Sequence, residues 1–312
     1  MNPTLRNRYL GALLGLACGD ALGSAVEFRR RGTFPPVTHM QGGGPFSLKP
    51  GEWTDDTSMA LCLAVSLLER EQFDARDQME RYCRWAREGH LSSNGECFDI
   101  GSTVADALRQ FRATGDPYSG PTNTYSAGNG CIMRLAPVVL FYYPERQKVL
   151  EMAAASSRTT HGATECLEAC QMLASVLFDL LEGHPRDDLL NASRWDFLKT
   201  LSSPRLRQIT AGSFRMKAIE AISGSGYVAD CLEASLWCFS RTTNFRDAVL
   251  MAANLGEDAD TTGAVCGQIA GAHYGLEDIP QAWLDVLAKR SLIEDIAAKL
   301  HDNASARLLN KL

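Results

Sequence analysis

The feature that most constrains the fold of this chain is its choice of aliphatic residues. The sequence holds 38 alanines and 38 leucines, against 12 valines and 9 isoleucines. Alanine and leucine favour helices, whereas the β-branched residues that favour strands are scarce. No stretch alternates between apolar and polar residues for long enough to predict a strand. We therefore predict an all-α fold, with many helices around one core.

Apolar residues recur at helical spacing in two long stretches, 57–69 and 162–181. In the first of them Met59, Leu63 and Leu67 share one stripe, which is typical of a helix with one buried face. The same spacing predicts further helices at 5–24, 75–88, 101–113, 147–156, 228–239, 245–255, 262–274, 280–288 and 291–300.

Three long stretches rich in glycine and proline separate these helices: 29–53, 114–130 and 183–212. Loops of this length in a compact domain are usually functional. No flexible linker and no repeat of 20 to 50 residues divides the chain. We predict a single compact multi-helix domain over residues 1–312, with long loops around a central cleft.

The composition excludes several classes of protein. Hydrophobic residues make up 45% and charged residues 22%, which are the proportions of a globular chain and not of a disordered one. The net charge of −6 argues against binding to nucleic acid or to an acidic membrane. We find no uninterrupted apolar run that could span a bilayer and no secretion signal, so we expect a cytoplasmic protein.

The ten cysteines contain no C-x-x-C pair, and most stand in segments rich in alanine and leucine. Zinc sites need closely paired ligands, which are absent from this spacing. We expect reduced, buried thiols.

Two segments far apart in the chain repeat the same chemistry at predicted helix starts. Aspartates stand beside threonine at 54–56 and again at 258–261, each time just before an apolar stretch. Alone, the first segment is explained as a helix N-terminus, capped by Thr54 or Asp55. If the two segments converge, their carboxylates must take up protons or bind cations. An all-oxygen site favours Mg²⁺ or Mn²⁺ over Zn²⁺, and two ions would neutralise four aspartates.

Six motifs, kept in order between residues 8 and 275, resemble those of the ADP-ribosylglycohydrolase family. The resemblance is strongest to its bacterial dinitrogenase-reductase-activating branch. The motifs are 11–23 (GALLGLACGDALG) with Glu27, 53–57 (WTDDT), 98–103 (FDIGST), 127–134 (AGNGCIMR) with Pro137, 160–161 (TH) and 256–263 (GEDADTTG). Each motif alone is weak, whereas six in sequence are specific.

The resemblance implies an all-helical fold with a binuclear Mg²⁺ or Mn²⁺ centre, whose ligands correspond to Thr54, Asp55, Asp56, Asp258, Asp260 and Thr261. It also implies hydrolysis of the N-glycosidic bond between ADP-ribose and arginine on a modified protein, with ADP-ribose as the product. The chemistry is consistent with these residues, because positive charge grows on the sugar during cleavage and carboxylates stabilise it. The guanidinium must leave protonated, which requires an acid or a proton path.

The resemblance assigns catalytic roles to four carboxylates: Asp99, Asp55, Asp56 and Glu27. Asp99 is the candidate for the proton transfer, although it could also cap the helix predicted near Gly101. Glu27, taken alone, would be explained as a solvated charge at a helix end. Asp20 is a candidate partner behind these residues, although a purely structural hydrogen-bonding role explains it better.

Substrate contacts are expected at Gly101, Ser102, Gly128, Asn129, Gly130, Arg134 and His161. The two glycines around Asn129 let the backbone approach a ligand closely. The family often has serine where this chain has Cys131. Arg134 suits either a phosphate or a buried carboxylate, and His161 is either a substrate contact or a structural residue.

Other functions remain open at this point. The same fold could act on ADP-ribose linked to serine, on poly(ADP-ribose) or on O-acetyl-ADP-ribose, although the Asp99 motif favours arginine. Residues 258–262 superficially resemble a haloacid-dehalogenase phosphatase loop, but no apolar strand precedes them. A non-catalytic relative is the fourth alternative. Reversal of nitrogenase modification and immunity against an ADP-ribosylating toxin would both use the proposed chemistry.

Overall fold

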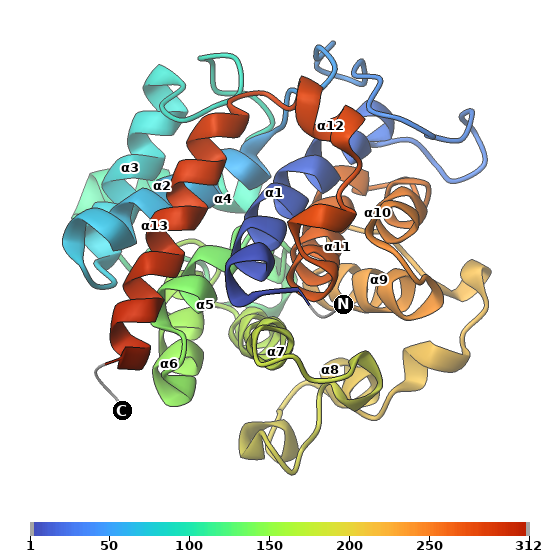
Figure 1. Cartoon of the computed structure of the whole chain (residues 1–312). Helices are drawn as coiled ribbons and strands as arrows, with labels where there is room; N and C mark the ends of the chain where they lie inside the picture. The colour runs from blue at the N-terminus through green and yellow to red at the C-terminus, as the bar shows by residue number, and fades with distance from the viewer. Residues whose placement is uncertain (1–2, 310–312) are drawn as a thin grey trace.

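The computed structural model describes residues 3–309, and in this range it consists of α-helices joined by loops and short 3₁₀ turns (Figure 1). The helices are α1 (Leu5–Gly23), α2 (Asp55–Arg70), α3 (Ala75–Glu88), α4 (Ser102–Thr114), α5 (Ala136–Tyr142), α6 (Arg146–Arg158), α7 (Thr164–Leu181), α8 (Pro204–Thr210), α9 (Val228–Arg241), α10 (Phe245–Ala253), α11 (Ala259–Tyr274), α12 (Gln281–Val286) and α13 (Arg290–Leu309). Between residues 3 and 309 there is no strand beyond two isolated bridges. The all-α prediction is confirmed.

Each stretch that was predicted helical from its apolar spacing overlaps a helix of the structure. Two helices were missed, α5 and α8, and each has seven residues. A helix this short shows too few turns for a periodic stripe, and both begin with a proline in the first turn. The last helix, α13, continues to Leu309, beyond its predicted end at residue 300.

The centre of the molecule is an antiparallel pair of helices, α1 and α11, which lie side by side (Figure 1). Glycines of the two helices face one another at three successive positions: Gly11 and Gly271, Gly15 and Gly267, and Gly19 and Gly263. A Cβ atom added at Gly15 would lie 2.3 Å from the carbonyl oxygen of Gly267, and one added at Gly19 would lie 2.0 Å from that of Gly263. Only glycine allows two helix backbones to approach this closely.

This seam places the end of α1 beside the beginning of α11. A Cβ atom added at Gly23 would lie 2.2 Å from the carbonyl oxygen of Ala259. Because Glu27 follows α1 after a single 3₁₀ turn, its carboxylate reaches the start of α11. The packing of two glycine-rich helices therefore carries one predicted site residue to the others.

Helix α1 and the turn after it also qualify, by length and composition, as a membrane-spanning segment. The stretch Leu5–Val26 has 22 residues, and an 18-residue window within it has a mean hydropathy of 1.4. The sequence analysis found no uninterrupted apolar run long enough to span a bilayer, and Asp20 does interrupt this stretch. In the structure 94% of the window is buried inside the protein, as in a helix surrounded by core.

All ten cysteines are free, and all but Cys97 are buried. This agrees with the expectation of reduced thiols that pack as small apolar side chains.

Candidate active site

The two aspartate segments lie in direct contact, although they come from distant parts of the chain. The Thr54 hydroxyl oxygen lies 3.3 Å from Asp260 Oδ2, and the Thr261 hydroxyl donates to Asp56 Oδ2 at 3.4 Å. Asp55, Asp56 and Asp260 each offer one carboxylate oxygen within 4.8 Å of the others. The structure thus brings together the residues whose convergence the sequence suggested.

Helix starts position both segments. Thr54 occupies the N-cap of α2, and Asp258 occupies the N-cap of α11. Neither side chain makes a capping hydrogen bond. The Thr54 hydroxyl instead faces the carboxylates of Asp56 and Asp260. The helix dipoles favour the carboxylates here, while the side chains remain available for a ligand.

The N-terminus of α2 is capped by Asp20, a residue of the neighbouring helix α1, and not by a side chain of α2 itself. Asp20 Oδ1 accepts from the Thr54 backbone N–H at 2.8 Å, and its Oδ2 accepts from the Thr57 N–H at 3.0 Å and from the Thr57 hydroxyl at 2.6 Å. Burial raises the pKa of Asp20 to about 6 in spite of these donors. Asp20 therefore holds the aspartate segment of α2 from behind, as the sequence analysis suggested.

A second acidic group adjoins the first. Glu27, Asp99 and Asp260 each offer an oxygen within 4.8 Å of the others. Glu27 is 3% exposed, which excludes its interpretation as a solvated charge. Asp99 has a left-handed backbone with φ of 58°. Asp99 does not cap α4. The N-cap residue of this helix is Gly101, and no side chain makes a capping hydrogen bond at this helix start.

The crowding of these carboxylates shifts their titration strongly. Burial, together with repulsion from the neighbouring carboxylates, raises the pKa of Asp55, Asp56 and Asp260 well above the usual range. Burial and then repulsion from Asp99 raise the pKa of Glu27 to about 10, and burial raises that of Asp99 to about 7. Protons or cations must offset this concentration of negative charge.

The donor set fits a hard cation. Two buried carboxylate oxygens, Glu27 Oε2 and Asp56 Oδ1, have no hydrogen-bond partner among the described residues, which is rare for buried polar atoms. The atoms of these carboxylates and threonines that could ligate a metal are all oxygens, which Mg²⁺ and Mn²⁺ prefer as ligands. Asn129 Nδ2 donates to Asp258 Oδ2 at 3.0 Å and so orients a further predicted ligand. The donor set of this site therefore matches what a hard divalent cation requires.

The carboxylates open onto a cavity of about 270 Å³. Five of them line it: Glu27, Asp55, Asp99, Asp258 and Asp260. Thr54 and Asp56 lie behind this wall and are almost completely buried. Among residues 3–309, no lysine or arginine lines the cavity. Its wall is therefore acidic, and only bound protons or cations offset its charge.

Most of the predicted substrate contacts form the remaining wall. Gly101, Ser102, Gly128, Asn129, Gly130 and His161 all line the cavity. The imidazole of His161 packs against the glycine loop, and a Cβ atom added at Gly130 would lie 2.8 Å from its Cε1. Burial lowers the pKa of His161 to about 4, so the ring is neutral at physiological pH.

Arg134 lies elsewhere than predicted. Its side chain is fully buried and is not part of the cavity wall. The guanidinium donates to the Thr160 hydroxyl at 2.6 Å and lies 4.7 Å from the ring centroid of Tyr82. The structure supports neither a phosphate contact nor a carboxylate partner for this arginine. It supports His161 from behind, because Thr160 also contacts the imidazole Nδ1 at 2.8 Å.

The sequence analysis missed five residues of the wall: Phe28, Thr103, Val104, Met133 and Gly226. Four of them adjoin or lie within motifs that it had singled out, so their sequence neighbours were a usable signal. Gly226 precedes α9, and nothing in its local sequence indicates the site.

The long loops differ in their relation to the cavity. The loop 114–130 contributes its glycine end to the wall. The loop 29–53 contributes no residue to it, although its Phe46 packs against the wall residue Phe28. No residue of 183–212 lines this cavity. The latter loop borders a separate, largely apolar pocket between α8 and α9. The expectation that all the long loops surround the site was therefore wrong for 183–212.

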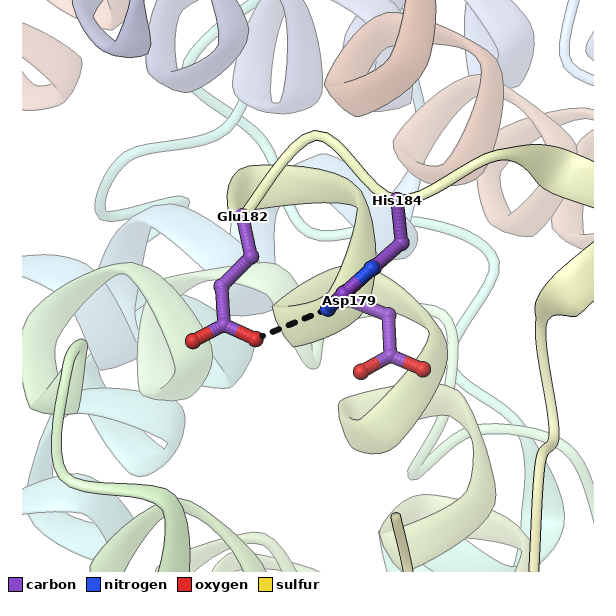
Figure 2. A group of neighbouring side chains, drawn as sticks. All are labelled: Asp179, Glu182 and His184. Carbon is purple, nitrogen blue, oxygen red and sulfur yellow. Dashed lines mark ion pairs between the residues drawn. The ribbon is translucent and has the colours of Figure 1, made fainter. Parts of the chain in front are cut away.

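A second acidic cluster lies at the end of α7 and consists of Asp179, Glu182 and His184 (Figure 2). His184 pairs with Glu182 at 3.3 Å. The carboxylates are already neutralised, since Arg194 pairs with Asp179 and Arg146 pairs with Glu182, each at 2.9 Å. With these arginines the three residues form an ion-pair network in which Asp179 is buried, so a metal ion would have to displace the arginines.

Enzymes that cleave glycosidic bonds typically use paired carboxylates in a cavity. Here such carboxylates lie beside a glycine loop whose backbone can approach a ligand closely. The helical fold and this acidic site define a hydrolase of that class. The family model for ADP-ribosylglycohydrolase matches residues 1–308, and the chain belongs to this family.

Known proteins similar to this chain agree with the family. The chain is 44% identical to the ADP-ribosylarginine hydrolase Tri1 of Serratia proteamaculans, over 93% of this chain and 78% of that protein. It is 32% identical to the ADP-ribosyl-[dinitrogen reductase] glycohydrolase of Rhodospirillum rubrum, over 96% and 97% of the two chains. A solved structure of an ADP-ribosylglycohydrolase-related protein complex superimposes with a TM-score of 0.86 at 47% identity, over 96% of this chain and 99% of that one.

Proposed function

We propose that this protein hydrolyses the N-glycosidic bond between ADP-ribose and an arginine side chain of a modified protein. One observation carries the proposal: the aspartates of α2 and α11 meet beside Glu27 and Asp99, at the wall of a single cavity. The similarity to a protein named as an ADP-ribosylarginine hydrolase supports the choice of linkage.

The reaction consumes one water molecule. The bond between the anomeric carbon and the guanidinium nitrogen breaks, and its electron pair stays on nitrogen. The oxygen of water bonds to the anomeric carbon, and a proton reaches the leaving nitrogen, so the products are ADP-ribose and unmodified arginine. Positive charge develops on the sugar during this step.

We propose two Mg²⁺ or Mn²⁺ ions as the cofactors. When bound, they supply positive charge that can hold sugar hydroxyls and lower the pKa of water. Asp55, Asp56, Asp258 and Asp260, together with the hydroxyls of Thr54 and Thr261, would hold these ions. Their oxygens gather at one place, and all of these residues except the half-buried Asp258 are buried.

The remaining residues bind substrate and move protons. Asp99 and Glu27 present carboxyl groups at the cavity wall, and we assign to Asp99 the proton that reaches the leaving nitrogen. The backbone at Gly128 and Gly130 has no side chain to keep a phosphate or ribose away. His161, neutral and packed on this loop, holds it in place.

We also propose a cytoplasmic setting, with an ADP-ribosylated protein as the partner and no role for nucleic acid or membrane. The free, buried cysteines and the net charge of −6 support this setting. The same chemistry would serve reversal of nitrogenase modification or immunity against an ADP-ribosylating toxin.

The test is release of ADP-ribose from defined linkages. The purified protein would be incubated with arginine-linked and serine-linked ADP-ribosyl peptides, poly(ADP-ribose), O-acetyl-ADP-ribose and a phosphate ester, each with Mg²⁺, with Mn²⁺ or with a chelator. We expect release from the arginine linkage, and loss of that release with the chelator. Preferential turnover of another substrate, or full activity in chelator, would contradict the proposal.

A further inference from the structure

Phe28 combines two unfavourable features on the cavity wall. Its ring is 67% exposed to solvent, although it follows the buried Glu27 directly. Its backbone has φ of 61°, in the left-handed region that a bulky residue rarely adopts. Strain of this kind persists where the surrounding structure enforces it and is concentrated at functional sites. An exposed, strained aromatic residue beside a catalytic carboxylate therefore points to a ligand contact.

The fold holds Phe28 firmly in this position. Its backbone N–H donates to the Glu257 carbonyl at 2.7 Å, and the Glu257 N–H donates to the Arg29 carbonyl at 2.7 Å. These two bonds tie Phe28 to the segment that precedes α11. The ring of Phe28 packs edge-on against Phe46, with the centroids 6.5 Å apart, and Phe46 contacts Phe98 at 5.4 Å. Since Phe98 precedes Asp99, this aromatic chain joins the segments that carry the two carboxylates.

The charge of the cavity wall indicates what would bind beside this ring. Five carboxylates line the cavity, and neither lysine nor arginine does so within the described part of the chain. Glu27 and Asp99 are the two of these carboxylates that are not proposed metal ligands, and a cationic group is attracted both by them and by the face of an aromatic ring. A planar guanidinium stacks on such faces especially well, because it is delocalised and weakly hydrated.

We propose that Phe28 is a specificity-determining residue whose ring receives the guanidinium of the modified arginine. This inference rests on the proposed arginine linkage. The contact strengthens as the guanidinium leaves protonated beside Glu27 and Asp99, because its full positive charge then faces the ring. A serine-linked substrate has no cation at this position and gains nothing from the ring.

Three variants of the full-length protein test the role of the ring. F28L removes the aromatic face and keeps the strained backbone, F28Y keeps the face, and F28N removes the face while accepting a left-handed backbone. With Mg²⁺ and ADP-ribosyl-agmatine, we expect F28L and F28N to lower kcat/KM roughly three- to tenfold, and F28Y to restore most of the loss. Product inhibition by free agmatine weakens by a similar factor, whereas the Kd for ADP-ribose, measured by calorimetry, stays within about twofold. F28N also unfolds at a higher temperature than F28L.

Any other outcome overturns the inference, and each one indicates a different role for the ring. An equal loss of ADP-ribose affinity would place the ring against ADP-ribose itself. A loss confined to ADP-ribosylated protein, with ADP-ribosyl-agmatine unaffected, would make Phe28 a docking residue for the modified partner. Unchanged kinetics in F28L and F28N would leave the ring without a role. If the unsubstituted protein fails to cleave any arginine linkage, the proposed function fails instead, and this is known before any variant is made.

Discussion

Asp99 is the residue on which the proposed proton transfer depends. Its carboxyl group lies on the cavity wall, with an oxygen within 4.8 Å of carboxylate oxygens of Glu27 and Asp260, and burial raises its pKa to about 7. A carboxylic acid that keeps its proton near neutral pH is suited to general acid catalysis. An amide in the same place keeps the shape and removes the exchangeable acid.

We therefore expect Asp99→Asn to lower kcat on an arginine-linked substrate by about 10²-fold or more. The Kd for ADP-ribose should change little, because the amide is nearly isosteric. Steady-state kinetics and calorimetry would measure the two quantities. Asp106→Asn, on the exposed face of α4, is the matched control. Near-normal turnover of Asp99→Asn would remove Asp99 from the mechanism.

His161 makes the stability of the folded protein depend on pH. Burial lowers its pKa to about 4 in the folded protein, whereas an unfolded histidine titrates near 6.5. The unfolded chain therefore binds more protons between these values, so the folded protein loses stability as the pH falls from about 6.5 to about 4. The lost contribution is about 3 kcal/mol for this residue.

A His161→Gln variant should consequently show a shallower loss of unfolding free energy over this pH range. Denaturant unfolding of both proteins at a series of pH values measures the difference between the two curves, which isolates His161 from the other titrating groups. His39→Gln, on the exposed loop 29–53, serves as the control and should follow the unsubstituted protein. Parallel curves for His161→Gln and the unsubstituted protein would show that folding does not shift the pKa of His161.

At the scale of helices, the sequence predicted where the helices lie along the chain better than it predicted which helices pack against each other. Apolar spacing located every long helix, because a buried stripe of 3.6-residue period is a local property. The glycine seam between α1 and α11 was not predicted, although both helices repeat glycine every fourth residue, at 11, 15, 19 and 23 and at 263, 267 and 271. Each repeat indicates a close approach, but a single sequence does not say which helix approaches which.

The seam predicts an unusual response to alanine. In most helices Gly→Ala is stabilising, by roughly 1 kcal/mol. At Gly19 the added Cβ would lie 2.0 Å from the backbone oxygen of Gly263, so the helices must separate. We expect Gly19→Ala to destabilise the protein by about 3 kcal/mol or more and to reduce activity, because the seam positions Glu27.

Thermal unfolding and ADP-ribose release would be measured for Gly19→Ala. Gly101→Ala is the matched stability control, since its φ is −61° and a Cβ there meets nothing within 4 Å. A Gly19→Ala protein that is as stable as the unsubstituted one would mean that α1 and α11 do not pack as closely as described.

At the scale of the whole molecule, the site is an assembly of distant segments. The end of α1, the start of α2, the residue Asp99 and the start of α11 meet at one cavity. Sequence reasoning anticipated the meeting of α2 and α11, because two clusters of like charge at helix starts share one requirement for cations. It misplaced Arg134 and the loop 183–212, since neither carries a comparable chemical constraint. Which buried arginine faces a cavity is decided by tertiary packing alone.

This concentration of charge couples the stability of the whole fold to divalent cations. A cation that binds only the folded protein stabilises it by about 2.7 kcal/mol at one hundred times its Kd. We expect Mg²⁺ or Mn²⁺ to raise the midpoint of thermal unfolding by several degrees over a chelated sample. Asp260→Asn should abolish this rise, because Asp260 belongs to both acidic groups of the site.

In chelator, Asp260→Asn should be the more stable of the two proteins, because it removes one of the crowded carboxylates. Differential scanning calorimetry with and without cation gives both comparisons, and Asp302→Asn, an exposed aspartate on α13, serves as the control. If Asp260→Asn retains the full cation-dependent rise, the ion binds elsewhere, and the cluster of Asp179, Glu182 and His184 becomes the candidate to test. The abolished rise, combined with greater stability in chelator, would mean that the fold tolerates its acidic centre in order to hold a cation there.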